Sequence, residues 1–338
     1  MTALWLRYDL RGGGIAVPTE RLYAAAIEQT AWADRQGFDR VMLGEHHGSA
    51  DGYVPSPMLL GAALAARSSC IRFHVCTVMP LHDPLRVAED VVVLDQISGG
   101  RVELSAAIGY VPFEFAMFGV PMRERAERVE AAIRTLRSAF SGEIFEYRGR
   151  QVRITPRPVQ GAGPPILVGG AVKASAARAA RLGDGFIPSV ADPALVRHYR
   201  EECARLGRPI GPVTTFHGSG FIHVTEDPER DWMRLAPHLL HELNAYSRWA
   251  REGGAKTLFP QDVTDIETLK ASGAYLVLTP DECLAHLRAE KAAGRDVMFN
   301  PLCGGLDPDL AWESLELLAA RVLPAFRHAG VTRSHSGG

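Results

Sequence analysis

Residues 164–188, PPILVGGAVKASAARAARLGDGFIP, contain two short apolar runs on either side of a helical pattern. Pro165–Val168 and Gly185–Pro188 are predicted to be strands, with a helix over Ala171–Leu182 between them. Strands that are apolar at nearly every position need cover on both faces, which is typical of a parallel sheet with helices packed against it. This stretch therefore predicts one strand–helix–strand unit of an α/β fold.

The same alternation continues along most of the chain. Six more strands are predicted, which with the two above makes eight: Ala3–Tyr8, Arg40–Leu43, Ile71–Met79, Arg101–Ala107, Val213–Val224 and Asp296–Pro301. The further predicted helices are Thr19–Gln36, Ser56–Arg67, Leu85–Ile97, Arg123–Phe140, Pro193–Leu206, Pro228–Arg251, Pro280–Ala293 and Pro308–Phe326. Strands and helices in this order predict a single-domain (β/α)8 TIM barrel over residues 1–328, with an open doubly wound sheet as the alternative.

Two segments exceed a simple barrel. Ile144–Ile154 (IFEYRGRQVRI) is predicted to be a β-hairpin, and Gly253–Tyr275 is predicted to be a polar insertion before the last strand–helix unit. Residues 329–338 are predicted to be a disordered tail because they are short, polar and terminal. We find no linker rich enough in flexible residues to divide the chain into two domains.

Composition narrows the class of protein. The chain has 338 residues, is 46% hydrophobic and carries a formal net charge of -2, which is typical of a globular protein with a large core and not of a nucleic-acid-binding protein. No apolar run reaches the ~18 residues of a membrane span. The first residues lack the pattern of a signal peptide, and the five cysteines include no CxxC motif. We therefore expect a cytoplasmic protein.

The second predicted strand ends in residues 41–48, VMLGEHHG. In a barrel, functional residues lie at the carboxyl-terminal ends of strands and in the loops that follow. Adjacent side chains on a strand point to opposite faces, so His46 and His47 are not expected to chelate one metal ion, and no metal site is predicted. Two interpretations remain. A histidine here could contact substrate or move a proton, or Glu45 and the histidines could only secure the loop.

Two other strand ends carry candidate ligand contacts. The third strand ends CTVMPLHDP (residues 76–84), where Cys76 and Thr77 could face a flat ligand, unless the prolines only form a rigid turn. The fifth strand ends in Gly169 and Gly170, followed by a helix that begins near Lys173 and Ser175. Bare backbone followed by a helix N-terminus could bind a phosphate, although two glycines are also common in ordinary turns.

Four segments in this order resemble the bacterial luciferase-like flavin-dependent monooxygenases. They are GFDRVMLGEHHG (residues 37–48), VMPLHDPLRVAEDVVVLDQISGGRVEL (78–104), IGYVPFEFAMFGV (108–120) and the quoted residues 164–188. The resemblance runs from about Leu4 to Pro188 and returns in FNPLCGGLDPDLAWESLELLAARVLPAF (299–326). The family has a TIM barrel, in agreement with the strand count.

The resemblance implies a chemistry. Such enzymes use reduced FMN, usually delivered by a separate flavin reductase, and insert one oxygen atom of O2 into a small organic substrate through a flavin peroxide. His46 matches the catalytic histidine of the family. His47, Glu45, Glu114 and Tyr110 are expected to shape the substrate pocket or its loops.

The resemblance also places the flavin. Its ring is expected beside Val75, Cys76 and Thr77, where a non-proline cis peptide at Val75–Cys76 is implied. Its phosphate is expected at Gly169, Gly170, Lys173 and Ser175. Family members commonly form homodimers, here expected through the small residues of Ser56–Arg67.

The chain departs from the family at Ile108. Luciferase has an arginine there that helps to hold the flavin phosphate. This departure leaves open a deazaflavin coenzyme and a hydride-transfer reaction on the same barrel. A third interpretation is a flavin-binding barrel without catalysis.

Overall fold

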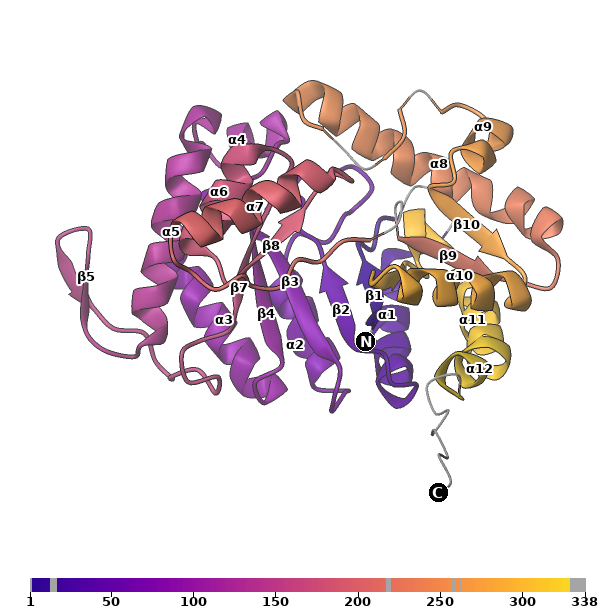
Figure 1. The fold of residues 1–338 in the computed structure, drawn as a ribbon, viewed down its shortest axis with the longest axis horizontal. Coiled ribbons are helices and arrows are strands. Elements are labelled where there is room, and N and C mark those ends of the chain that lie inside the picture. The colour runs from indigo at the N-terminus through magenta and orange to yellow at the C-terminus, as the bar shows by residue number, and fades with distance from the viewer. Residues whose placement is uncertain (1, 13–16, 217–219, 257–258, 262, 329–338) are drawn as a thin grey trace, which may run out of the picture.

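The computed structural model describes residues 2–12, 17–216, 220–256, 259–261 and 263–328. Its main element is a curled parallel sheet of seven strands with the order β11-β1-β2-β3-β4-β7-β8 (Figure 1). These strands are β1 (Leu4–Tyr8), β2 (Arg40–Leu43), β3 (Arg72–Val78), β4 (Val102–Ala107), β7 (Ile166–Gly170), β8 (Gly185–Pro188) and β11 (Val297–Phe299). The predicted tail at 329–338 lies outside the described residues.

The eighth barrel position differs from the prediction of one strand over Val213–Val224. Val213 forms an isolated parallel bridge with Phe186 of β8. The regular strand β9 spans only Phe221–Val224 and lies near β11 at the edge of the curled sheet. Instead of joining the main sheet, β9 pairs in parallel with β10 (Tyr275–Leu278). β10 was not predicted, because its four residues directly follow the polar insertion.

The helices occupy the predicted positions, with two additions. They are α1 (Thr19–Arg35), α2 (Pro57–Ala65), α3 (Pro84–Ser98), α4 (Pro112–Met117), α5 (Arg125–Phe140), α6 (Lys173–Leu182), α7 (Pro193–Arg205), α8 (Pro228–Gly253), α9 (Ile266–Ala271), α10 (Pro280–Ala292), α11 (Pro308–Leu317) and α12 (Leu323–His328). A π-helical turn joins α11 to α12. The short helices α4 and α9 were not predicted. α9 lies inside the segment that we expected to be only a polar insertion.

The predicted hairpin is confirmed. β5 (Phe145–Tyr147) and β6 (Arg150–Val152) pair in antiparallel register, with Phe145 opposite Val152. Figure 1 shows this hairpin projecting from the body of the molecule, far from the strand ends that hold the candidate site. We therefore do not include it in the site.

Alternate residues of the strands face opposite sides of the sheet, as a period of two requires. Leu6, Val41 and Phe73 are fully buried in the main apolar cluster, together with residues of α1 and α2. Trp5 and His74 instead meet across the intervening strand β2, with ring centroids 5.5 Å apart. Only the concave face of the curled sheet allows that contact, so these side chains fill the barrel interior.

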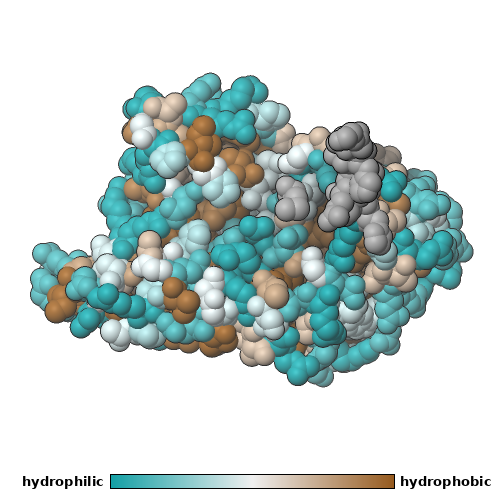
Figure 2. Space-filling view, turned by 60° about the horizontal axis from the view of Figure 1, so that its bottom comes forward, coloured by the Kyte–Doolittle hydropathy of each residue, from teal (hydrophilic) through white to brown (hydrophobic). Residues whose placement is uncertain are grey.

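No helix in the described part of the chain is long and apolar enough to cross a membrane. Figure 2 shows one face of the molecule as mostly hydrophilic, with hydrophobic residues in small separate groups. Exposed apolar residues of this kind are normal on folded proteins. Most of the apolar residues lie in the core between the sheet and the helices.

Candidate active site

His46 follows β2 at the carboxyl-terminal mouth of the barrel. Its Nδ1–H donates to Glu114 Oε1 at 2.8 Å, and the same oxygen accepts the backbone N–H of His47 at 2.8 Å. Glu114 is 1% exposed and lies on α4, in the loop that follows β4. Its second oxygen, Oε2, is buried without a hydrogen-bond partner among the described residues. The carboxylate thus orients His46 and leaves Nε2 as the free ring nitrogen.

Aromatic side chains surround the imidazole. Trp249 lies 4.4 Å from His46 between ring centroids, and Tyr53 lies 4.8 Å away in an edge-on arrangement. Tyr110 and Tyr246 complete the ring of contacts. Burial lowers the pKa of His46 below its ordinary value, although Glu114 opposes the shift. The shift favours the neutral imidazole, whose Nε2 can accept a proton, among these aromatic rings.

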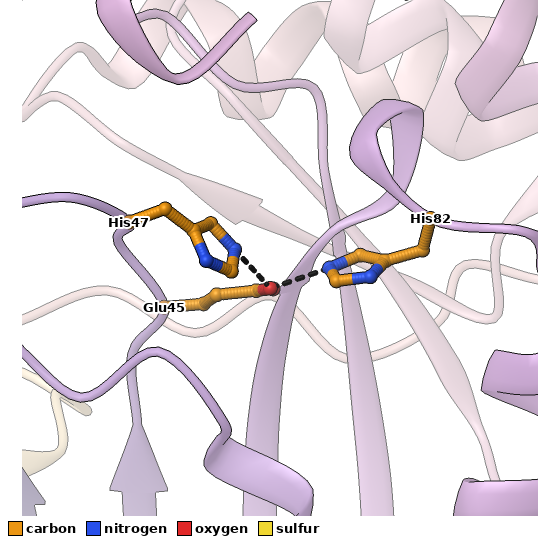
Figure 3. Close-up of side chains that lie close together, drawn as sticks. All are labelled: Glu45, His47 and His82. Carbon is orange, nitrogen blue, oxygen red and sulfur yellow. Dashed lines mark hydrogen bonds and ion pairs between the residues drawn. The ribbon is translucent and has the colours of Figure 1, made fainter. Parts of the chain in front are cut away.

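Glu45 and His47 point to the other side of the strand from His46, as alternation predicts. Glu45 Oε1 accepts from His47 Nε2 at 2.7 Å and from His82 Nε2 at 2.5 Å (Figure 3). Glu45 Oε2 accepts the Val78 N–H at 2.6 Å. Burial opposes ionisation of Glu45, but the two imidazoles outweigh it and lower its pKa to about 2. These residues secure the loops behind His46, and the backbone N–H of His47 shares the Glu114 oxygen that holds the His46 ring.

A buried group of charges follows β1. Arg7 Nη2 donates to Tyr246 Oη at 2.6 Å and lies 3.2 Å from Glu242 Oε1. Arg11 Nη1 pairs with Asp51 Oδ2 at 2.6 Å. The guanidinium of Arg11 also lies 4.5 Å from the ring centroid of Tyr246. These contacts attach the end of β1 to α8, which carries the Tyr246 and Trp249 side chains of the His46 pocket.

The carboxyl-terminal end of α8 meets the loop that follows β4. A Cβ atom built at Gly253 would lie 1.9 Å from the carbonyl oxygen of Tyr110. A residue without a side chain is therefore required for this approach. The contact places Tyr110 beside Trp249 and His46, so the predicted pocket residue Tyr110 does join the site.

Only one of the three predicted ring-binding residues faces the barrel interior. Val75 is fully buried in the core under the helices, and Thr77 lies on that same side of β3. Cys76, between them, faces inward and its thiol hydrogen-bonds with Ser105. Strand alternation explains the correction, because a run of three residues cannot face one ligand.

The implied cis peptide is also absent. Val75 and Cys76 pair in continuous parallel register with Leu104 and Ser105 of β4. Thr155–Pro156 is the one cis bond in the described residues. The regular ladder keeps the Val75–Cys76 bond trans.

The predicted phosphate cradle lies at the end of β7. A Cβ at Gly170 would lie 2.3 Å from Ser175 Oγ, so the close turn requires glycine there. Ser175 Oγ donates to the Val172 carbonyl at 2.6 Å and accepts its N–H at 3.2 Å. The Ser175 hydroxyl is thus used by the turn itself. Gly169, the exposed Lys173 and the first N–H groups of α6 lie beside this turn.

Several functional residues were missed from the sequence. Arg7, Asp9 and Arg11 occupy every second position at the end of β1, and this period-two run of charges was a usable signal. His82 lies in the quoted MPLHDP segment without an assigned role. Tyr246 and Trp249 had no local signal, because helical spacing on α8 is equally typical of core residues.

The luciferase-like monooxygenase family matches residues 10–296. The 4-hydroxyprotoasukamycin monooxygenase of Streptomyces nodosus subsp. asukaensis is 27% identical over 91% of this chain and 89% of that protein. The oxygenase component of flavin-dependent trigonelline monooxygenase from Acinetobacter baylyi is 24% identical over 94% of this chain and 93% of that protein. An uncharacterized protein of Sinorhizobium fredii is 34% identical, but the match spans 49% of this chain and 50% of that protein.

Solved structures share the fold. Monooxygenase RslO1 from Streptomyces bottropensis superposes with a TM-score of 0.78 at 22% identity, over 96% of this chain and 99% of that one. The oxygenating constituent of 3,6-diketocamphane monooxygenase from Pseudomonas putida, in complex with FMN, gives 0.73 at 21%, over 96% and 98%. An F420-dependent secondary alcohol dehydrogenase gives 0.67 at 17%, over 96% and 99%. The barrel prediction is confirmed, and the chain belongs to the luciferase-like monooxygenase family of oxidoreductases.

Proposed function

We propose that this protein is the oxygenase component of a two-component monooxygenase that uses reduced FMN and O2 to oxidise a small organic substrate. The observation that carries the proposal is His46, held by Glu114 with a free Nε2 at the barrel mouth. Membership of the family supports the reaction class. The name of the trigonelline relative, an oxygenase component, supports a separate flavin reductase as partner.

The residues at the end of β7 fit the phosphate of FMN. Gly169 and Gly170 leave the backbone bare, and Val172 offers no side chain to cap the free N–H groups of α6. Lys173 would add a positive charge, in place of the arginine that Ile108 replaces. Cys76 would lie beside the flavin ring. When bound, reduced FMN supplies the electrons that activate O2, while the protein orients it.

His46 would act as the proton-transfer residue. Glu114 accepts the Nδ1–H, which sets the tautomer and leaves Nε2 to accept or return a proton at the substrate. The aromatic side chains of Trp249, Tyr53, Tyr110 and Tyr246 pack around the His46 ring and would limit the access of water to the reacting groups. Exclusion of water protects reactive intermediates from side reactions. Glu114 Oε2, buried and unpartnered among the described residues, is an acceptor for a donor group of the substrate.

A second candidate function is hydride transfer with a deazaflavin coenzyme. Two observations favour it: Ile108 stands where luciferase has its phosphate-binding arginine, and the fold is shared with an F420-dependent secondary alcohol dehydrogenase. That reaction needs no O2. Oxygen dependence therefore separates the two candidates.

The test supplies either reduced FMN with O2 or reduced deazaflavin without O2, beginning with trigonelline and 3,6-diketocamphane as substrates. Isotopically labelled O2 is expected to leave one labelled oxygen atom in the product of the FMN reaction. Turnover with deazaflavin in the absence of O2 would replace the first proposal by the second. Titration of both reduced cofactors, read by protein fluorescence, gives the preference even before a substrate is found.

We also propose that the protein forms a homodimer through α2 and α3. The predicted small-residue contact is only partly available, because Gly61 packs on Leu94 and Leu43 of the same chain. Exposed apolar residues nearby support the same face instead: Leu59 is 75% exposed on α2, and Val93 and Ile97 are 48% and 46% exposed on α3. Leu59→Glu should convert the dimer to a monomer in light scattering, and a wild-type monomer would refute the dimer.

A further inference from the structure

A second constellation lies on the opposite side of β2 from His46. Glu45 and His47 are two residues apart after the strand, so they share a side, and His82 reaches them from the turn after β3 (Figure 3). Glu45 Oε1 is 2.7 Å from His47 Nε2 and 2.5 Å from His82 Nε2. The three donor atoms all lie within 4.8 Å of one another. Two imidazole nitrogens and one carboxylate oxygen therefore converge on one point.

The surroundings hold this arrangement in place. Glu45 Oε2 accepts the Val78 N–H at 2.6 Å, which fixes the carboxylate and directs Oε1 toward the two histidines. Glu45 and His47 are buried, whereas the side chain of His82 is 27% exposed. His82 is therefore free to move away from Glu45 and His47, which would widen the space between the three side chains. Ligand-orienting hydrogen bonds of this kind are a regular feature of metal sites.

The cluster opens into a pocket of about 370 Å³ between α2 and α3. Thr77 lines this pocket together with Glu45 and His82. Thr77 is 4% exposed, and its Oγ1 is buried without a hydrogen-bond partner among the described residues. A buried hydroxyl without a partner is unfavourable, so this one is poised for a ligand or for water held by a ligand. A loop-securing role for Glu45 alone does not account for it.

We propose that Glu45, His47 and His82 form a binding site for a divalent transition metal ion, with Zn²⁺ as the best match. Two imidazoles and one carboxylate are a common donor set for Zn²⁺, and a further position would remain open toward the pocket. Ligand atoms about 2.1 Å from a metal lie farther apart than the present hydrogen bonds allow, so His82 swings outward on binding. The sequence prediction of no metal site considered only the pair His46 and His47.

The site is independent of the flavin chemistry. His46 points into the barrel and the cluster points away from it, so the metal would contact the residues on either side of His46 without contacting His46 itself. A metal ion that binds only the folded chain stabilises it. We therefore expect the bound ion to stabilise the segment that carries His46.

The test uses the full-length protein, treated with a chelator and then titrated with ZnCl2 by calorimetry. Binding of one Zn²⁺ per chain and a rise in melting temperature are expected. Co²⁺ titrated into the same protein reports the ligands through its visible absorption bands. His82→Gln and His47→Gln should each weaken binding by roughly 10-fold or more, since even supporting residues of metal sites contribute that much.

His198→Gln is the matched control, because the His198 side chain on α7 is 26% exposed, close to the 27% of His82, and it forms an ion pair with Glu201 outside the cluster. It should bind Zn²⁺ as the wild type does. His82→Gln is the safer variant, since His82 is partly exposed; its fold is checked by circular dichroism. No saturable binding by the wild-type protein at micromolar Zn²⁺, or equal binding by His82→Gln and the control, would overturn the proposal. The Co²⁺ spectrum of the wild type gives the ligand type without any variant.

Discussion

His46 Nδ1 lies 2.8 Å from Glu114 Oε1, and that oxygen also accepts the backbone N–H of His47. One carboxylate therefore holds both the imidazole and the segment that carries it. Glu114 lies on α4 after β4, whereas His46 follows β2, so two separate loops set the direction of His46 Nε2. A displacement of either loop would turn this nitrogen away from the barrel mouth.

Glu114→Gln should lower kcat by roughly 10- to 100-fold, less than the 10²- to 10⁴-fold of a complete general acid–base contribution. The amide keeps the shape of the side chain but cannot stabilise a positive imidazole. Binding of reduced FMN, measured by fluorescence, should be unchanged. Glu124→Gln is the control, because Glu124 pairs with Arg128 on the surface. An unchanged kcat in Glu114→Gln would show that Glu114 only secures the loop.

The pH dependence of turnover should report His46. Burial lowers the pKa of His46, so its Nε2 remains unprotonated to a lower pH than that of a free histidine. The acid limb of kcat/KM should therefore lie below about pH 6.5, the ordinary value of the side chain. Values of kcat/KM measured in overlapping buffers from acid to neutral pH give the position of the acid limb. A limb above pH 7 would assign the proton transfer to another group.

The sequence predicted the part of the site that depends on local periodicity. Alternation along β2 separates His46 from its neighbours Glu45 and His47, and the structure confirms that separation. The same rule, applied to Val75, Cys76 and Thr77, would have selected Cys76 alone. The side chains of three consecutive strand residues cannot all face one ligand, because they alternate between the two faces of the sheet.

The rest depends on contacts between segments far apart in the chain. Arg7 meets Tyr246 only because α8 crosses the end of β1, and no local pattern specifies that crossing. His82 reaches Glu45 only because the turn at Met79–Leu81 redirects the chain after β3. β10 was missed because a four-residue apolar run after a polar segment has too few residues to show a period.

Arg11→Met should lower the free energy of unfolding by about 3–5 kcal/mol, because it removes a buried positive charge that pairs with Asp51 and lies close to Asp9. Asp51 Oδ2 lies 2.6 Å from Arg11 Nη1, and the Arg11 side chain is fully buried. The double variant Arg11→Met with Asp51→Asn should recover part of that loss. The coupling free energy between Arg11 and Asp51 is measured by denaturant unfolding of the wild type, both single variants and the double variant. Strictly additive losses would show that Arg11 acts through packing on the aromatic rings and not through its charge.

His223 should make the protein less stable as the pH falls. Burial lowers its pKa from 6.5 to about 4, although Asp231 opposes the shift. His223 is therefore protonated below about pH 6.5 in the unfolded chain but only below about pH 4 in the folded protein. Stability is lost as the pH falls through this range, because the unfolded chain binds more protons. Between pH 7 and pH 5 this single group should remove about 2 kcal/mol from the free energy of unfolding.

The comparison with His223→Gln isolates that contribution, since the other titrating groups are common to both proteins. Denaturant unfolding at pH 7, 6 and 5 should show the wild type losing about 2 kcal/mol more than the variant. If wild type and His223→Gln fall in parallel, His223 is protonated in the folded protein at pH 5. Its contact with Asp231 would then cancel the effect of burial, and the pKa of His223 would be unshifted by folding.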